Sequence, residues 1–427
     1  MRPHAVQQSY RRSPARFNVV PAGRRSGKTE LAKRKLVYRS LRGTDFMPAR
    51  FFAAAPTRDQ AKKIWWDDLK ALSPRNLVAG SPSETELSIR YLNGSELHVL
   101  GMDKPERVEG TPWDGGVLDE YGNMKKDAWT AHVQPALADR NGWCDFIGVP
   151  EGWNHYAELY ERARFDKSGE WAAFHWVSAD ILSPEAIATA RRDLDELTFQ
   201  QEYEASFVNF TGRAYYPFGV AEHCAPLSYD PEGTLVLCFD FNVSPGIAAI
   251  CQEQVLPNQQ RGTGVIGQVW IRHNSQTPMV CSRLIQDWGQ HKGPVHCYGD
   301  ATGGSRGTAK VAGSDWDLIR KILGPVFGQR LRIIVPEANP KERVRVNSVN
   351  SRLKSVDGTI RLMVDPTKAP NVVRDFERVR VVDGGSGEID KNADPELTHL
   401  SDAIGYHIVR EFPIVEYNVG MVKLTGY

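Results

Sequence analysis

Near its N-terminus the chain reads Ala22-Gly23-Arg24-Arg25-Ser26-Gly27-Lys28-Thr29. This stretch lies between an apolar run at 17–20, typical of a buried strand, and a helical pattern at 29–41. Strand, loop and helix in this order are the context of a phosphate-binding loop, in which backbone N–H groups and the helix N-terminus surround phosphate oxygens. We therefore expect Gly23 to Thr29 to bind ATP, with Lys28 on the β- and γ-phosphates and the Thr29 hydroxyl on Mg²⁺.

An acidic pair, Asp119-Glu120, follows a predicted strand at 116–118. The aspartate can hold the Mg²⁺ shell, and the glutamate can orient and deprotonate the attacking water. A helix N-cap is the alternative for this pair, because acidic residues also favour a helix start. Two features depart from the usual pattern: Ala22 stands where the loop normally has glycine, and Gly115-Gly116 replace bulky residues before the pair. The loop and the pair together favour catalysis, with Glu120 as the catalytic residue.

ATP hydrolysis often needs an arginine that stabilises the charge of the transition state. Arg24 inside the loop and Arg107 before the acidic strand are the candidates. For Arg107 the alternative is a salt bridge with Glu106 or Glu109.

Three aspartates in the second half stand in settings that suit divalent metals. Asp240 lies in the apolar run Cys238-Phe239-Asp240-Phe241, Asp300 ends a predicted strand before Ala301-Thr302-Gly303-Gly304, and Asp402 lies on a predicted helix at 395–410. Carboxylate oxygens are the ligands that Mg²⁺ and Mn²⁺ prefer, and two such ions can hydrolyse a phosphodiester. His399 precedes Asp402 by three residues and shares its helix face. Each aspartate taken alone also fits a turn or a surface pair; the three together favour a metal site.

The pattern of elements predicts an α/β protein with two domains. Strands that alternate with helices in the first half imply a parallel sheet covered on both faces. A stretch rich in Gly, Pro and Tyr then separates the halves. We expect an ATPase domain at 1–208, a linker at 209–232 and a metal-site domain at 233–427. Further predicted strands are 50–55, 145–149, 234–240, 246–252, 265–272 and 295–298, and further helices are 60–72, 184–207 and 277–289.

Bulk composition narrows the class of protein. The 427 residues are 41% hydrophobic and 25% charged, and the net charge is +1. A dedicated DNA-coating protein would be more basic, although local patches decide binding. The six cysteines form no Cys-x-x-Cys pair, which argues against a zinc site or a disulfide framework. No apolar run approaches the roughly 20 residues that span a bilayer, and no secretory signal is evident, so we expect a cytosolic protein without membrane contact.

These motifs, in this order, resemble the large terminase subunit of tailed bacteriophages over nearly the whole chain. The stretch 146–154 is similar to the coupling motif of that family, with Val149 where a small hydroxyl residue is common, and 198–203 is similar to the end of its ATPase domain. The resemblance implies an N-terminal P-loop ATPase domain with a parallel sheet and a C-terminal ribonuclease-H-like nuclease domain. It also implies that Asp240, Asp300 and Asp402 form the acidic triad, with His399 as an auxiliary ligand. Arg107 resembles the trans-acting finger, and Gln7 or Gln8 the glutamine that reads adenine; we favour Gln8.

What the resemblance implies about function is a viral DNA-packaging motor. ATP hydrolysis would drive double-stranded DNA into the procapsid, and Mg²⁺- or Mn²⁺-dependent cuts in concatemeric DNA would start and end packaging. The implied partners are the DNA, the portal protein and a small terminase subunit, with a homo-oligomeric ring on the procapsid in the host cytoplasm. The hairpin around Gly384–Gly387, with Arg378 and Arg380, is the predicted DNA contact.

Two other functions fit parts of the pattern. A helicase–nuclease of repair or defence would need a second, tandem ATPase-like domain, and the aspartate triad stands in its place. A non-catalytic ATP-binding scaffold is motivated by Ala22 and by the two glycines before Asp119, and it predicts binding without turnover.

Overall fold

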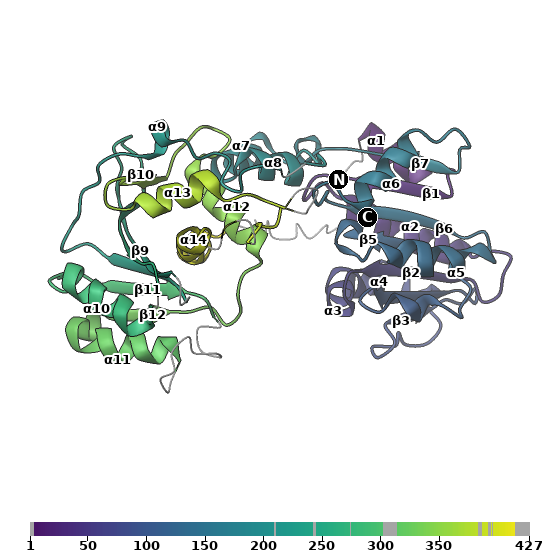
Figure 1. Cartoon of the computed structure of the whole chain (residues 1–427). Coiled ribbons are helices and arrows are strands. Elements are labelled where there is room, and N and C mark those ends of the chain that lie inside the picture. Colours follow the sequence, from purple (N-terminus) through teal and green to yellow (C-terminus); the bar gives the residue numbers. More distant parts are fainter. Residues whose placement is uncertain are drawn as a thin grey trace. The chain divides into compact units, whose positions relative to one another are not determined.

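The computed structural model describes residues 4–208, 211–241, 245–273, 275–301, 314–382, 387–391, 394 and 396–414. The chain forms two compact units, one of Met1–Ala188 with Phe199–Asn209 and the other of Thr189–Thr198 with Phe210–Tyr427. Each unit is a sheet packed with helices, as the sequence predicts for an α/β protein (Figure 1).

The first unit is built on a seven-stranded sheet in the order β3-β4-β2-β5-β6-β1-β7. All neighbouring strands are parallel except β3, which is antiparallel to β4. The strands are β1 Phe17–Pro21, β2 Arg50–Ala55, β3 Ser88–Arg90, β4 Glu96–Gly101, β5 Gly115–Asp119, β6 Trp143–Gly148 and β7 Trp171–Ala173. The α-helices are α1 Ala5–Arg12, α2 Lys28–Arg42, α3 Arg58–Ala61, α4 Asp67–Leu72, α5 Gln134–Ala138, α6 His155–Arg164, α7 Pro184–Asp193 and α8 Glu196–Glu202, the last two of which cross the division between the units.

The central strands of this sheet are buried on both faces and mostly apolar. Every residue of β1 and β5 is buried. Such strands need a cover on each side, which helices of the crossover connections provide. One cluster on the sheet includes Leu36 and Trp65, and another includes Phe146 and Trp171. The carboxyl ends of β1 and β5 therefore meet at one edge, where the loop and the acidic pair follow them.

Two glycines in β5 allow large side chains to pack against the sheet. A Cβ on Gly115 would lie 2.1 Å from the indole nitrogen of Trp143, and a Cβ on Gly116 would lie 2.4 Å from the ring of Phe52. Atoms this close to a rigid ring would force the strand or the ring to shift. The glycines before the acidic pair are therefore explained by packing.

The second unit has a six-stranded sheet in the order β12-β11-β8-β9-β10-β13. Strands β8, β9 and β10 pair antiparallel, and β11 and β12 run parallel to β8. The strands are β8 Leu235–Asp240, β9 Gly246–Val255, β10 Arg261–Ile271, β11 Val295–Gly299, β12 Leu331–Ile334 and β13 Leu362–Val364. The α-helices are α9 Val220–His223, α10 Thr277–Trp288, α11 Asp315–Phe327, α12 Glu342–Leu353, α13 Pro370–Arg378 and α14 His399–Glu411.

Some predicted elements differ in the structure. The predicted helix at 184–207 is wrong as a single element, because α7 ends at Asp193 and α8 begins at Glu196. The buried carboxylate of Asp195 accepts the backbone N–H of Thr198 and so caps α8. The predicted helix at 60–72 contains a π-helical turn, Lys62–Trp66.

The hairpin at 379–390 is present where it is described. Val381 and Ile389 form an antiparallel bridge, while residues 383–386, which include most of the predicted loop, lie outside the described residues. None of the described helices has the length and the apolar character that crossing a membrane requires.

Candidate functional site

The phosphate loop of the first unit joins β1 to α2. Gly27 has a φ of 81° and precedes the first residue of α2, a left-handed conformation that glycine adopts without strain. Ala22 instead extends the sheet: it forms a parallel bridge with Trp176, and its N–H donates to the Gly148 carbonyl at 3.1 Å. An extended residue needs no glycine, so Ala22 fits this loop.

The loop side chains suit a bound phosphate with its magnesium ion. Lys28 is buried at the start of α2, and the Thr29 hydroxyl lies 3.2 Å from a carboxylate oxygen of Asp119. The Ser26 hydroxyl is fully buried and has no hydrogen-bond partner among the described residues. A buried hydroxyl without a partner is costly, and a phosphate oxygen would satisfy it.

The acidic pair combines burial with a constrained backbone. Burial and the charge of Glu120 raise the pKa of Asp119 to about 7, while the Lys28 ammonium opposes the rise. A cation beside this carboxylate would therefore be favoured. Glu120 has a φ of 52°, a left-handed conformation that is rare outside glycine and is found at functional sites.

The segment that resembles the coupling motif contacts the turn after Glu120. Asn154 donates from its side-chain amide to the Gly122 carbonyl at 2.9 Å and caps α6 by accepting the N–H of Tyr156. The N–H of Gly152 donates to the Gln201 side chain of α8 at 3.1 Å. A displacement of the acidic turn would therefore reach 146–154 through direct contacts.

The two candidate arginines differ in their surroundings. Arg24 donates to the Glu202 carboxylate at 2.6 Å, and its carbonyl accepts the Ser178 hydroxyl at 2.7 Å, so this arginine is held within the unit. Arg107 is exposed and has no ion pair with the described residues. Glu109, which could have neutralised it, pairs with His132 instead. Arg107 is therefore exposed without an ion pair among the described residues, whereas the partly exposed Arg24 is held by Glu202.

The two candidate adenine-reading glutamines face in different directions. Gln7 is buried on α1 and donates from its side-chain amide to the Ser26 carbonyl at 2.9 Å. Gln8 is exposed. Gln7, rather than the favoured Gln8, therefore contacts the phosphate loop in this structure.

A buried ionic cluster beneath the loop escaped prediction from sequence. Asp145 of β6 is fully buried and lies 2.8 Å from the Lys35 ammonium. The same carboxylate accepts the Tyr10 hydroxyl and the Asn18 amide, each at 2.7 Å. The cluster ties α1, β1, α2 and β6 together. A polar residue in each of two buried strands, Asn18 and Asp145, was the available signal.

Two of the predicted metal ligands end adjacent strands of the second unit. Strand β8 ends at Asp240, and Asp300 follows β11 in a register that pairs Gly299 with Phe239. The two aspartates thus lie side by side at one edge of the sheet. Nδ1 of His399, the first residue of α14, lies 2.9 Å from Oδ2 of Asp240. Asp300 accepts the side-chain amide of Asn339 at 2.6 Å.

Asp402 is the predicted aspartate ligand that α14 carries, and its carboxylate contacts two cations. Its Oδ1 accepts Nη2 of Arg345 at 2.7 Å, and its Oδ2 lies 3.4 Å from Nζ of Lys391. Burial raises the pKa of Tyr406, Arg345 opposes the rise, and the charges of the three aspartates (Asp300, Asp240 and Asp402) add to it. One hydroxyl therefore lies within electrostatic range of all three carboxylates.

A fourth aspartate orients the helix that carries these residues. Asp375 of α13 is fully buried and accepts the backbone N–H groups of Leu400 and Ser401 at 3.0 and 3.1 Å. It satisfies donors at the α14 N-terminus, where Thr398 provides no side-chain cap.

Each of the three carboxylates has a protein partner in this structure: His399 for Asp240, Asn339 for Asp300, and Arg345 with Lys391 for Asp402. No group of three or more His, Cys, Asp or Glu side chains is placed to hold a metal ion in the described ranges. Hard carboxylate oxygens at one sheet edge nonetheless have the donor chemistry that Mg²⁺ and Mn²⁺ require. The metal assignment of Asp240, Asp300, Asp402 and His399 therefore stays a prediction.

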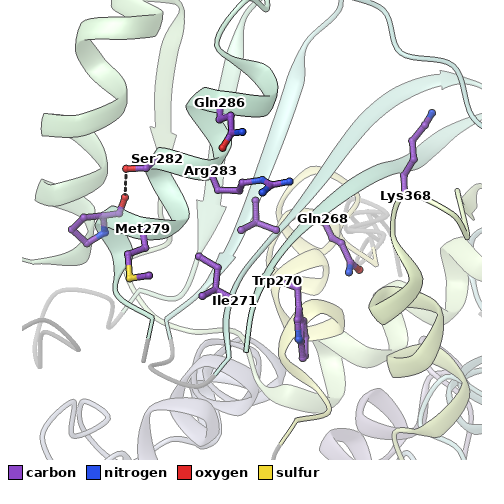
Figure 2. Close-up of a pocket in the computed structure, with 10 residues that line it drawn as sticks. Gln268, Trp270, Ile271, Met279, Ser282, Arg283, Gln286 and Lys368 are labelled. Atoms are coloured by element: carbon purple, nitrogen blue, oxygen red, sulfur yellow. Dashed lines mark hydrogen bonds between the residues drawn. The ribbon is translucent and has the colours of Figure 1, made fainter. Parts of the chain in front are cut away.

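A groove elsewhere on the second unit differs in character. It has a volume of about 700 Å³ between β10 and α10 and is lined by apolar and amide side chains together with Arg283 and Lys368 (Figure 2). None of its lining residues is acidic, so the groove is distinct from the aspartate cluster.

Comparison with known proteins finds sequence similarity to large terminase subunits of phages. A large terminase subunit of Thermus phage G20c is 25% identical over an alignment of 273 positions, gaps included, which covers 56% of this chain and 55% of that protein. The large terminase subunit of Escherichia phage T5 is 27% identical over an alignment of 171 positions, gaps included, which covers 38% of this chain and 39% of that protein. The curated relatives of this chain are phage large terminases. The chain thus spans about half the length of the Thermus phage protein and a smaller share of the T5 protein. No protein-family model matches the chain.

Solved structures support the same fold. The large terminase of a thermophilic bacteriophage aligns with a TM-score of 0.65 over 95% of this chain and 97% of its own, at 14% identity. The same phage protein in complex with ATP-gamma-S aligns with a TM-score of 0.61 at 13% identity. The predicted α/β fold is confirmed, with a mostly parallel sheet in the first unit and a separate sheet in the second, and the chain shares it with phage large terminases.

Proposed function

We propose that this chain is the ATP-powered motor of viral DNA packaging and carries its own metal-dependent endonuclease. ATP hydrolysis drives double-stranded DNA into the procapsid, and the nuclease cuts concatemeric DNA to start and end packaging. The observation that carries the proposal is that two clusters of side chains with the residue types of phosphate chemistry lie in separate units of one chain. Lys28, Thr29 and Asp119 converge in the first unit, and Asp240 and Asp300 lie side by side in the second.

In the ATPase site each residue has a distinct task. Gly23 to Thr29 bind the phosphates, with Lys28 as the buried cation. Thr29 and Asp119 hold the Mg²⁺ ion, which neutralises charge on the phosphate oxygens when bound. Glu120 takes the proton of the attacking water. Exposure of Arg107 supports its role as a finger supplied to a neighbouring subunit of a ring.

In the nuclease site Asp240, Asp300 and Asp402 hold Mg²⁺ or Mn²⁺, and His399 assists through its contact with Asp240. Ions held there would supply an activated water and would stabilise the leaving oxygen. Asp375 and Arg345 keep α14 and Asp402 in place.

The assembly follows from the same proposal. The motor forms a homo-oligomeric ring on the procapsid, contacts the portal protein, and receives viral DNA from a small terminase subunit in the host cytoplasm. Arg378 and Arg380 beside the hairpin are exposed, which supports their contact with DNA phosphates.

Plasmid digestion with Mn²⁺ tests the nuclease. Wild type is compared with Asp240→Ala, Asp300→Asn and Lys28→Ala. We expect Asp240→Ala and Asp300→Asn to abolish cutting while ATP hydrolysis persists, and Lys28→Ala to keep cutting while ATP hydrolysis is lost. Unchanged cutting by both aspartate variants would refute the metal site.

ATP turnover separates the motor from a non-catalytic scaffold. We expect measurable hydrolysis that Lys28→Ala or Glu120→Gln abolishes. ATP binding without turnover in the wild type, with and without DNA, would favour the scaffold. A helicase–nuclease is disfavoured because the second unit carries the aspartate sheet in place of a second ATPase-like domain.

A further inference from the structure

Two cations of different accessibility hold the two oxygens of Asp402. Arg345 contacts Oδ1 at 2.7 Å, and its side chain is 5% exposed. Lys391 lies 3.4 Å from Oδ2, and its side chain is 51% exposed. The two contacts therefore differ in how readily solvent or an ion can replace them.

Arg345 is fixed by packing. Its guanidinium lies 4.7 Å from the centroid of the Tyr406 ring. A Cβ on Gly405 would lie 2.5 Å from Cγ of Arg345, so the arginine stem fills the space that the glycine leaves. A buried guanidinium in this position cannot leave Asp402 without opening the contact between α12 and α14.

Lys391 has another partner within reach. Its Nζ lies 2.9 Å from Oε2 of Glu342, closer than it lies to Asp402. The other oxygen of Glu342 accepts the backbone N–H of Ile389 at 2.6 Å, which holds this carboxylate beside the lysine. Lys391 can therefore leave Asp402 and keep an ion pair.

We propose that Lys391 is a displaceable counter-cation of the nuclease site. It neutralises Oδ2 of Asp402 until a divalent cation ligates that oxygen, and it then pairs with Glu342 alone. Arg345 stays on Oδ1 and limits Asp402 to ligation through Oδ2. Lys391 and the metal compete for one oxygen, so the lysine sets the metal concentration at which the site fills. The inference rests on the proposed metal site and adds a residue that regulates its occupancy.

Calorimetric titration of the full chain with Mn²⁺ measures this competition without relying on cleavage. We expect Lys391→Met to tighten Mn²⁺ binding by about two- to fivefold, the range of a partly exposed ion pair. Glu342→Gln should weaken binding by a similar factor, because Lys391 loses its second partner while the amide oxygen can still accept from Ile389. The double variant should bind like Lys391→Met, because Glu342 acts through the lysine.

Lys354→Met is the matched control. Lys354 is a half-exposed lysine of the same unit that pairs with Glu222 at 2.9 Å. It should leave the Mn²⁺ affinity unchanged. Equal affinities of wild type and Lys391→Met, with binding lost in Asp402→Asn, would overturn the competition and leave the metal site intact. Wild-type binding that Asp402→Asn does not weaken, or no binding at all, would refute the metal site and this inference with it.

Discussion

Replacing Lys35 by Met tests the buried cluster beneath the phosphate loop. The lysine side chain is 4% exposed, and that of its partner Asp145 is 0% exposed. The variant keeps most of the apolar stem of the lysine but removes the ammonium. Asp145 would then lose its cationic partner in the core and keep two hydrogen bonds from the neutral groups of Tyr10 and Asn18.

The expected cost follows from that geometry. Removing one partner of a buried ion pair costs about 3–5 kcal/mol, because the remaining charge is desolvated and unpaired. The hydroxyl of Tyr10 and the amide of Asn18 still solvate the carboxylate, so we expect the lower end, about 3 kcal/mol. Lys33→Met is the matched control on the same helix. Lys33 is also buried, but the side chain of its partner Asp68 is 46% exposed, so we expect a loss of about 1 kcal/mol or less.

Native-state hydrogen exchange, read by mass spectrometry on peptides of β1 and β6, measures the effect in the full chain. A loss of about 3 kcal/mol should speed exchange of amides that open only with the whole unit by roughly 100-fold, and the control should speed it by a few fold. Equal protection in Lys35→Met and Lys33→Met would refute the reasoning, because it would mean that the charge of Asp145 is compensated without Lys35.

Three further predictions concern other parts of the molecule. Gly115→Ala should cost about 1–3 kcal/mol through overpacking against Trp143 and should slow ATP hydrolysis, since β5 ends at Asp119; unchanged thermal unfolding and turnover would contradict the packing argument. Burial lowers the pKa of His407 to about 3, with Arg352 and His296 adding to it. Below its ordinary pKa of about 6.5 the unfolded chain therefore binds a proton that the native chain does not, so stability falls as the pH falls, by about 2 kcal/mol at pH 5. His407→Leu should remove this contribution to the loss of stability between pH 7 and pH 5, which unfolding experiments at the two pH values measure. The same pH dependence in the variant and in the wild type would contradict the role of His407. The charge reversals Arg378→Glu and Arg380→Glu should weaken DNA cleavage and lower the slope of log affinity against log salt by about 2, and an unchanged slope would remove this surface from the DNA contact.

The sequence was sufficient for features that depend on local order. An apolar run, a glycine-containing loop and a helical pattern follow one another within 26 residues, 17–42, and the structure has β1, the loop and α2 there. Asp240 and Asp300 could each be placed at a strand end from the apolar residues before them. Their adjacency then followed from the parallel pairing of β8 and β11.

Features that depend on tertiary partners were not predictable in this way. Lys35 and Asp145 stand 110 residues apart and look like surface charges in sequence, yet both are buried. Arg345 lies on α12, a helix that was not predicted from the sequence, and nothing in the sequence indicates its partner Asp402. The break at Asp195 in the predicted helix 184–207 also depends on a tertiary partner. Local propensity favours a continuous helix, and a buried carboxylate that accepts the Tyr216 hydroxyl at 2.5 Å overrides it.

Ala22, Gly115 and Gly116 depart from the usual ATPase sequence pattern and favoured a non-catalytic scaffold. Each of these residues has a structural cause that is unrelated to a loss of catalysis. Ala22 lies in an extended bridge that requires no glycine, and Gly115 and Gly116 accommodate the rings of Trp143 and Phe52. A degenerate site would have lost the groups that react, but Lys28 is buried at the helix start and Asp119 lies beside Thr29. Glu120 is held in a left-handed conformation, which costs free energy and is retained where function requires it. Turnover in the wild type and its loss in Glu120→Gln is therefore the expected result, and binding without turnover would show that these local features are insufficient for catalysis.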